Sequence, residues 1–351
     1  MKAKTISERE NYLRAIEFKN PEWIPMTLEF TSAVWDRHGK DLATLLQEHP
    51  LVTGNHHRGY HPFHDTDPIC VQGMTYRDDW GCVWHNAQGG IIGRVIEHPL
   101  QDWSAFRNYL PPDPLKQYNW ATLKRKTEDD REKGFLTTAL PESFAQGGFF
   151  DRMIMLRGFE NLLMDLLDQP PQLPDLIAML LDYNIRYLQK WLEIGVDIIW
   201  HHGDIGSQNR LLFSPAIFRR YLKPAYKTLF KIAREAGTHV WYSSDGHVLD
   251  VVDDLLECGV SLHDPQVRAN TINGIRDHYK NKLCALVDID EQMLPFCSPQ
   301  DIDNQISEVV QKIADPRGGL MIFAIPSHDV PLRNIEAILV AWERHCFFDW
   351  P

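Results

Sequence analysis

The feature that most constrains this sequence is a regular alternation of short apolar runs with longer helical stretches, which fills the chain from Phe135 onward. The apolar runs have the length of buried strands, and the stretches between them show helical periodicity. Strands are expected at residues 136–140, 196–200, 239–242, 260–262, 283–287 and 320–324. Strict alternation of strand and helix indicates parallel strands joined by right-handed crossovers. The pattern therefore predicts an α/β fold, as an open doubly wound sheet or a barrel.

Helix start and stop signals support the same pattern. Helices are expected at residues 159–167, 174–194, 215–236, 248–258, 270–279, 299–314 and 332–345. Ser214 precedes a proline and is a good N-cap, whereas Gly237 and Gly259 follow the ends of two expected helices. No G-x-G-x-x-G motif follows any expected strand, and the glycines of 88–93 are interpreted as a turn. We therefore expect a single-domain (β/α)8 TIM-type barrel over residues 1–351.

The N-terminal third is less regular and is expected to be an irregular extension of the barrel. A helix over residues 7–18, capped by Ser7, precedes a first strand over residues 25–30. Residues 56–84 show little periodicity, with a short hairpin expected around residues 76–84.

Composition narrows the class of partner and the compartment. The net charge of −12 argues against nucleic acid or an anionic membrane, because both require basic patches. The run Lys124–Lys126 is followed at once by Glu128–Asp130, which is typical of a solvated helix or loop. None of the six cysteines forms a C-x-x-C pair, and no apolar run reaches the length of a signal or membrane segment. A cytoplasmic location is the simplest expectation.

Polar side chains follow five consecutive expected strands, where a barrel places its catalytic groups. The clusters are residues 201–208, 243–247, 263–266, 288–292 and 327–329, and they are rich in His, Asp and Gln. Each residue alone could be a helix cap or a solvated loop side chain. As a set, they indicate a shared pocket for a small-molecule substrate. Histidine and carboxylate can bind a divalent metal, move protons or hydrogen-bond a polar substrate.

The order of several short motifs resembles the uroporphyrinogen decarboxylase superfamily, which also contains cobalamin-dependent methyltransferases. The motifs are R-A-I-E-F-K-N-P-E-W-I-P (14–25), D-I-I-W-H-H-G-D-I-G-S-Q (197–208), S-P-A-I-F-R-R-Y-L-K-P (214–224), S-S-D-G (243–246), L-H-D-P-Q (262–266), V-D-I-D-E-Q (287–292) and G-G-L-M-I-F-A-I-P-S-H (318–328). The resemblance spans nearly the whole chain and implies a distorted (β/α)8 barrel. It does not fix the reaction, because function lies in the site and not in the fold.

The sequence departs from the pattern of the decarboxylase branch. That branch places arginines after the first strand, in a segment like M-R-Q-A-G-R-Y, to hold a substrate with many carboxylates. Residues 31–35 are Thr-Ser-Ala-Val-Trp here, so the arginine anchor is missing. The sequence therefore looks nearer to the methyltransferase-like members.

The methyltransferase branch, which this sequence resembles, looks like one that binds zinc through an H-x-C segment and a later Cys. Ser243, Asp245 and His328 stand at those three positions here. Asp245 and His328, completed by His202 or Glu29, could still hold a divalent metal, most simply zinc with N/O ligands. The alternative is that no metal is bound and that these groups contact the substrate directly.

The resemblance favours an enzyme that moves a methyl group between a small methylated or methoxylated compound and a corrinoid on a partner protein. Asp245, His328 and His202 would then polarise the substrate, while Asp204 and Asp290 orient it or exchange a proton. The expected substrate contacts are Gln208, His247, Gln266 and Glu29. The alternatives are a decarboxylase or other lyase acting on a carboxylated small molecule, and a binding protein without catalysis.

Overall fold

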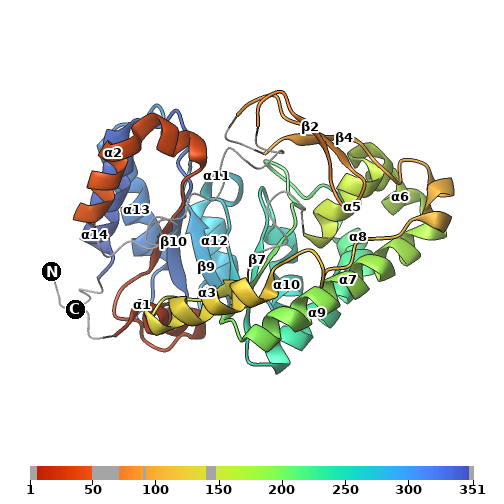
Figure 1. Ribbon diagram of the computed structural model, residues 1–351. Helices are drawn as coiled ribbons and strands as arrows, with labels where there is room; N and C mark the ends of the chain where they lie inside the picture. The colour runs from red at the N-terminus through yellow and green to blue at the C-terminus, as the bar shows by residue number, and fades with distance from the viewer. Residues whose placement is uncertain (1–5, 50–70, 90–91, 140–147, 348–351) are drawn as a thin grey trace. The chain divides into compact units, whose positions relative to one another are not determined.

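The computed structural model describes residues 6–49, 71–89, 92–139 and 148–347 (Figure 1). Cα packing divides the chain into two compact units. The first unit comprises residues 1–72, 88–91 and 263–351, and the second comprises residues 73–87 and 92–262. The single domain expected over residues 1–351 stays a prediction. Among the described residues, no helix combines the length and the apolar character needed to cross a membrane.

The parallel strands follow the order β1-β10-β9-β8-β7-β6-β5. Their bounds are β1 Met26–Leu28, β5 Thr138–Ala139, β6 Ile198–His202, β7 His239–Ser243, β8 Leu262–His263, β9 Cys284–Asp288 and β10 Leu320–Ala324. Strands that are consecutive in the chain are neighbours, and β1 pairs with β10 in the first unit, with Met26 opposite Ile322. The first strand lies beside the last strand, as the closure of a barrel requires. The predicted α/β fold of the distorted (β/α)8 type is confirmed.

The first unit surrounds β1, β9 and β10 with helices. Its helices are α1 Glu8–Glu17, α2 Ser32–Glu48, α11 Val267–Asn270, α12 Ile272–Tyr279, α13 Pro299–Ile313 and α14 Leu332–His345. The backbone N–H of Glu10 donates to the predicted cap Ser7 over 3.1 Å. All residues of β9 and β10 are buried, as expected for parallel strands that are covered on both faces. The core of this unit therefore consists of the same apolar runs that predicted the strands.

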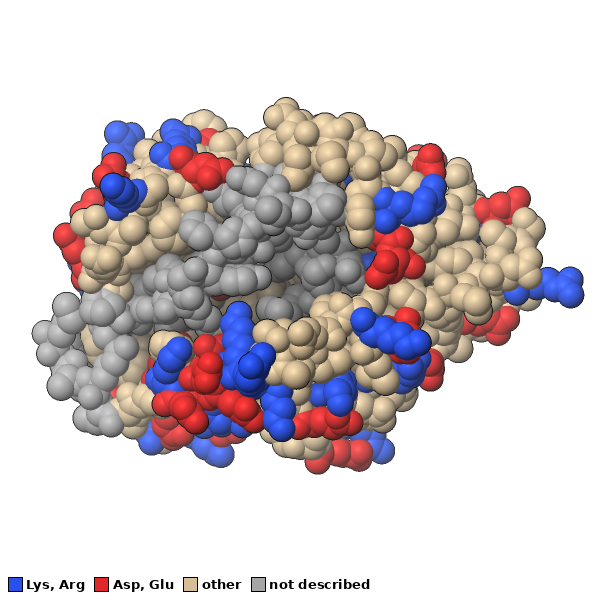
Figure 2. Space-filling view, viewed as in Figure 1, with Lys and Arg blue, Asp and Glu red and all other residues tan. Residues whose placement is uncertain are grey.

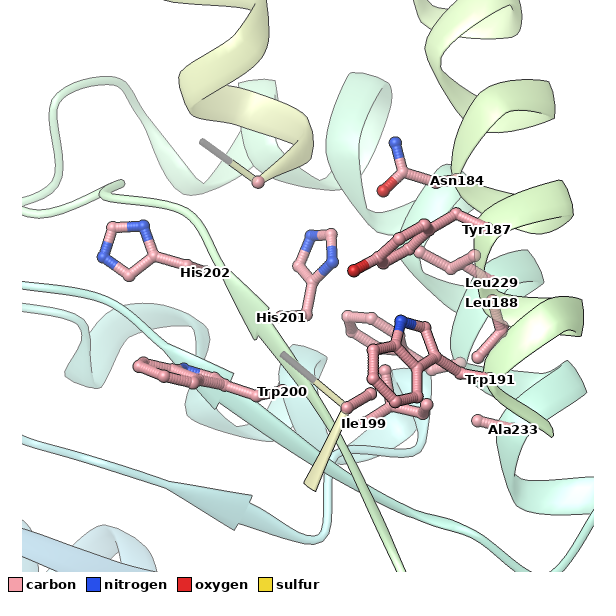
Figure 3. Close-up of a pocket in the computed structure, with 13 residues that line it drawn as sticks. Asn184, Tyr187, Leu188, Trp191, Ile199, Trp200, His201, His202, Leu229 and Ala233 are labelled. Carbon is pink, nitrogen blue, oxygen red and sulfur yellow. The ribbon is translucent and has the colours of Figure 1, made fainter. Parts of the chain in front are cut away.

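The second unit carries β5, β6 and β7 and a second group of helices. These are η3 Trp103–Asn108, α3 Trp120–Glu132, α5 Phe149–Arg157, α6 Phe159–Asp168, α7 Gln172–Ile194, α8 Pro215–Ile217, η4 Phe218–Leu222, α9 Lys223–Glu235, η5 Leu249–Val251 and α10 Val252–Cys258. The helix expected over 215–236 is interrupted by the π-helical turn η4. Helix α7 ends at Gly195, where φ is 85°, and packs against α9. These two helices cover the outer face of β6 (Figure 3).

An antiparallel ribbon confirms the expected hairpin. Strands β2 Thr75–Arg77, β3 Val83–His85 and β4 Arg94–Glu97 pair in sequence. Buried Asp78 accepts hydrogen bonds from Trp84 Nε1 over 2.9 Å and from Arg152 Nη1 over 3.3 Å. The guanidinium of Arg152 also lies 4.6 Å from the centre of the Trp80 ring. The ribbon is therefore anchored to the beginning of α5 by a buried ion pair.

The mixed charge run lies on α3, where Figure 2 shows Lys and Arg interleaved with Asp and Glu. Lys124 Nζ lies 3.9 Å from Glu128 Oε1, one helical turn away. Most of the side chains from Lys124 to Glu132 are exposed. The interpretation of this run as a solvated helix is confirmed.

Candidate active site

Strand β6 places two consecutive histidines in different surroundings. It runs to His202, two residues beyond the predicted end, so that His201 and His202 are part of the strand. Successive side chains of a strand point to opposite faces. Figure 3 shows Trp200 and His202 on one side of β6 and His201 on the other side. The two histidine side chains therefore cannot contact the same ligand.

His202 lies between two carboxylates. Its Nδ1 is 2.7 Å from Asp151 Oδ2, and its Nε2 is 3.5 Å from Asp204 Oδ1. Asp151 stands in the first turn of α5, and its second oxygen accepts the backbone N–H of Asp204 over 3.0 Å. An ionised carboxylate can only accept a hydrogen bond, so Asp151 holds the proton of His202 on Nδ1 and leaves the Nε2 lone pair facing Asp204. We name Asp151, His202 and Asp204 the histidine cluster.

A glycine allows α5 to reach β6. Gly148 is the N-cap of α5, and a Cβ atom built on it would lie 1.4 Å from the backbone oxygen of His202. Any other residue would push the first turn of α5 away from the strand. Glycine at this position therefore brings Asp151 within hydrogen-bonding distance of His202.

The loops after β6 and β7 interlock and bring a third acidic residue to the cluster. The backbone N–H of Asp245 donates to Asp204 Oδ1 over 2.8 Å, and that of Ile205 donates to Ser244 Oγ over 3.1 Å. Gly246 has a φ of 81°, and a Cβ atom on it would lie 2.6 Å from the carbonyl carbon of Gly206. This close approach of the two loops fixes the position of Asp204.

The surroundings change the acidity of two of these carboxyls. Loss of hydration raises the pKa of Asp204 to about 6, with Asp151 and Asp245 acting in the same direction and His202 opposing them. Loss of hydration also raises the pKa of Asp245. A carboxyl with a pKa of about 6 exchanges its proton readily near neutral pH, as a general acid or base must.

His201 occupies an apolar pocket on the outer face of β6. Tyr226 and Phe230 lie 5.2 Å from its ring, measured between centroids, and its Nε2 has no hydrogen-bond partner among the described residues. A cavity of about 30 Å³ adjoins it, between β6 and helices α7 and α9 (Figure 3). Burial lowers the pKa of His201 to about 3. His201 is therefore neutral at ordinary pH and is a core residue.

Comparison with known proteins places the chain in a family. Residues 95–343 match the sequence model of Uroporphyrinogen decarboxylase (URO-D), which is more than half of the chain. The chain belongs to the URO-D family. No match was found among curated proteins.

Solved structures share the fold of this URO-D protein at low sequence identity. A methyltransferase from Methanosarcina mazei is 14% identical over 97% of this chain and 99% of its own, with a TM-score of 0.65. A D-psicose 3-epimerase from Clostridium cellulolyticum is 11% identical over 66% of this chain and 85% of its own, with a TM-score of 0.41. A 3-keto-D-glucoside 4-epimerase from E. coli is 16% identical over 65% and 87%, with a TM-score of 0.40. The first of these similarities supports the barrel fold of this URO-D protein.

Two further predicted site residues of the URO-D protein lie in the second unit. Gln208 is exposed in the loop after β6. The backbone N–H of His247 donates to Ser207 over 2.7 Å, and its Nε2 is 4.0 Å from Asp250. Both residues belong to the interlocked loops that carry Asp204 and Asp245. Their contact with a substrate stays a prediction.

The other four predicted residues belong to the first unit. Glu29 directly follows β1 and donates its backbone N–H to Ala324, and the carbonyl of His328 accepts from Arg37 over 2.6 Å. Gln266 forms a parallel bridge with Asp288. The remaining residue, Asp290, makes an ion pair with Arg268 over 2.8 Å. Their participation in one site with His202 stays a prediction.

Asp151 is the member of the histidine cluster that the sequence analysis missed. It lies in α5, a helix that was not predicted, and follows β5 by more than ten residues. A signal was present, because residues 136–140 were expected to form a barrel strand and Asp151 belongs to the segment that follows it. The polar clusters that predicted the site directly follow the five later strands, so Asp151 is not among them.

The histidine cluster offers donor atoms for a divalent metal, and His202 is the predicted ligand among them. The donor atoms of Asp151, His202 and Asp204 all lie within 4.8 Å of one another. Both oxygens of Asp151 accept hydrogen bonds. His202 Nε2 and Asp204 Oδ1, which also accepts the backbone N–H of Asp245, face each other. Their separation of 3.5 Å suits two ligands of one ion, with ligand bonds of about 2.1 Å. Catalytic zinc usually takes three protein ligands, so the cluster supplies part of such a site.

Proposed function

We propose that this URO-D protein is an enzyme that transfers a methyl group between a small methylated or methoxylated compound and a corrinoid on a partner protein. The observation that carries this proposal is His202, held between Asp151 and Asp204 at the carboxyl end of β6. Active sites of (β/α)8 enzymes lie at that end of the strands. The methyltransferase from Methanosarcina mazei, which shares the fold, adds support for this reaction class.

The histidine cluster suits the departure of a methyl group from oxygen or nitrogen. The departing methyl leaves its bonding electron pair on the heteroatom, which then needs a proton. Nε2 of His202 and Oδ1 of Asp204 face each other, so that either group can give or receive that proton. Asp151 fixes the ring and stabilises its charged form. Positioned acid–base groups of this kind contribute about 10²–10⁴-fold to a rate.

Other groups in this proposal act around the proton-transferring pair. Asp245 donates its backbone N–H to Asp204 and adds a carboxylate to the same end of the barrel strands. The corrinoid of the partner would supply the methyl-accepting centre. A divalent metal held by His202 and Asp204 would take the place of this proton transfer and would act as a Lewis acid on the substrate.

A decarboxylase is the second candidate, because the matched family is described by that activity. Decarboxylation also needs a proton at the carbon that loses carbon dioxide, and the same His202–Asp204 pair can supply it. The absence of arginines in residues 31–35 is unfavourable for a substrate with many carboxylates. Methyl transfer is therefore preferred.

The test is to incubate the purified protein with reduced cobalamin and a panel of methylated and methoxylated compounds. Methylcobalamin formation is followed by its absorption spectrum, and carbon dioxide release is measured in parallel with carboxylated compounds. We expect methylcobalamin to form, at a rate reduced about 100-fold or more in Asp204→Asn. Asp253→Asn, on the exposed face of α10, is the matched control.

Each alternative has its own signature in this assay. Carbon dioxide release without methyl transfer would replace the proposal with the lyase. Tight binding of a compound without any turnover would indicate a binding protein.

A further inference from the structure

We propose that the methyl donor is an organic cation whose positively charged nitrogen carries the methyl group. This inference rests on the proposed methyl transfer and narrows its substrate class from methylated or methoxylated compounds to methylated ammonium compounds. Two independent features of the second unit carry it: a stacked pair of tryptophans and the charge balance of the histidine cluster.

The tryptophan pair lies on the same face of the sheet as His202. Trp200 of β6 is directly opposite Trp241 of β7, and their rings stack with centroids 4.5 Å apart and an interplanar angle of 9°. Figure 3 shows Trp200 and His202 on the same side of β6. One same-face step along a strand is about 7 Å. A small ligand at the histidine cluster can therefore also contact the indole pair.

These indoles are half-buried, unlike the fully buried residues of β9 and β10. Barrel interiors are usually filled by branched aliphatic side chains. Two indoles in that position bring electron-rich rings to the carboxyl end of the strands. Such rings attract cations, and Trp attracts them more strongly than Tyr or Phe.

The charge balance of the site is negative. The histidine cluster brings Asp151 and Asp204 to one imidazole, and Asp245 is bonded to Asp204 through its backbone. Arg152, which follows Asp151 in α5, makes an ion pair with Asp78 and is compensated there. The sequence of the two loops that carry these residues shows the same bias, because residues 201–208 and 243–247 contain no Lys or Arg.

A cation satisfies both features at once. A carboxylated substrate would be repelled by the aspartates, and a neutral methoxy compound would leave their charge uncompensated. An ammonium group pairs with the carboxylates on one side and with the indole faces on the other. Quaternary ammonium ligands are commonly recognised in this way.

The reaction balances with such a donor. The C–N bond breaks, and its electron pair stays on nitrogen, which becomes a neutral amine. The methyl group passes to cob(I)alamin, which contributes the electron pair of the new bond. The amine then takes a proton from the His202–Asp204 pair and leaves as an ammonium ion.

The test measures binding separately from catalysis. Choline, its neutral isostere 3,3-dimethyl-1-butanol and the anion 3,3-dimethylbutyrate are titrated into the full chain by calorimetry. We expect choline to bind at least about tenfold more tightly than the neutral isostere, as a desolvated cation–π contact predicts. Trp200→Leu and Asp204→Asn should each remove most of this preference, whereas Trp200→Phe should retain part of it. Trp120→Leu on α3 is the matched control and should leave it unchanged.

The outcomes separate this inference from the proposed function. Equal binding of the three probes, or tighter binding of the anion, overturns the cationic substrate. A choline preference that is equally strong in Trp200→Leu and in Trp120→Leu also overturns it. A clear choline preference without methylcobalamin formation leaves the cation site intact and rejects the methyl transfer. Methyl transfer from neutral methoxy compounds without any choline preference supports the proposed methyl transfer and rejects the cationic substrate.

Discussion

Acidification should destabilise this URO-D protein through His201, and the size of the effect follows from its burial. The unfolded chain binds a proton at this side chain with a pKa of 6.5, whereas burial lowers the pKa in the folded protein to about 3. Below pH 6.5 the unfolded state therefore binds more protons, so stability falls as the pH decreases. Between pH 8 and pH 5 the loss from His201 is about 2 kcal/mol, and it reaches about 4 kcal/mol at pH 3.

The assay is urea unfolding at a series of pH values, for the wild type and for His201→Phe. Phenylalanine suits the surrounding Tyr226, Phe230 and Tyr242, and the adjoining cavity of about 30 Å³ offers room for the larger ring. The variant should lose about 2 kcal/mol less than the wild type between pH 8 and pH 5. His263 also has a pKa lowered to about 3 by burial, but it contributes equally to both proteins. Stability curves that run parallel with pH would refute the reasoning, because they would mean that His201 is already charged in the folded protein.

Three further predictions address the histidine cluster and its support. Asp151→Asn should lower the methyl-transfer rate about 100-fold with little change in thermal stability, because it loses the charge that orients His202; an unchanged rate would remove Asp151 from the site. If the cluster holds zinc, elemental analysis should find about one equivalent in the wild type and much less in His202→Ala and Asp204→Ala; a metal-free wild type would favour direct acid–base chemistry. Asp78→Ala should destabilise the second unit by about 3–5 kcal/mol in urea unfolding, because it leaves the Arg152 charge buried and unpaired; a loss below about 1 kcal/mol would show that water reaches that charge.

The fold could be predicted where burial alone decides the structure. Strand β10 and helix α14 match the expected ranges residue for residue, because one is a continuous apolar run and the other has a clear helical period. Strand β6 begins and ends two residues later than predicted, since His201 and His202 resemble loop residues. His201 is accommodated in the strand by an aromatic pocket that only the tertiary packing creates.

Part of the site could be predicted from the order of strands along the chain. His202, Asp204 and Asp245 follow consecutive strands, so the barrel pattern alone brings them together. Asp151 reaches them from the start of a helix, through a close approach at Gly148 that no local pattern reveals. The stacking of Trp200 on Trp241 depends on the register of β6 and β7, which the sequence does not state.

The ion pair between Arg152 and Asp78, which anchors the antiparallel ribbon, affects which substitutions can change the reaction rate. Asp151 and Arg152 are consecutive, so the residue that orients the His202 ring and the residue that anchors the ribbon move as one piece of α5. A substitution that shifts the ribbon on Arg152 therefore alters the alignment of the imidazole without touching it. Laboratory evolution of this protein should accordingly find rate-changing substitutions in the ribbon, where no substrate contact would explain them.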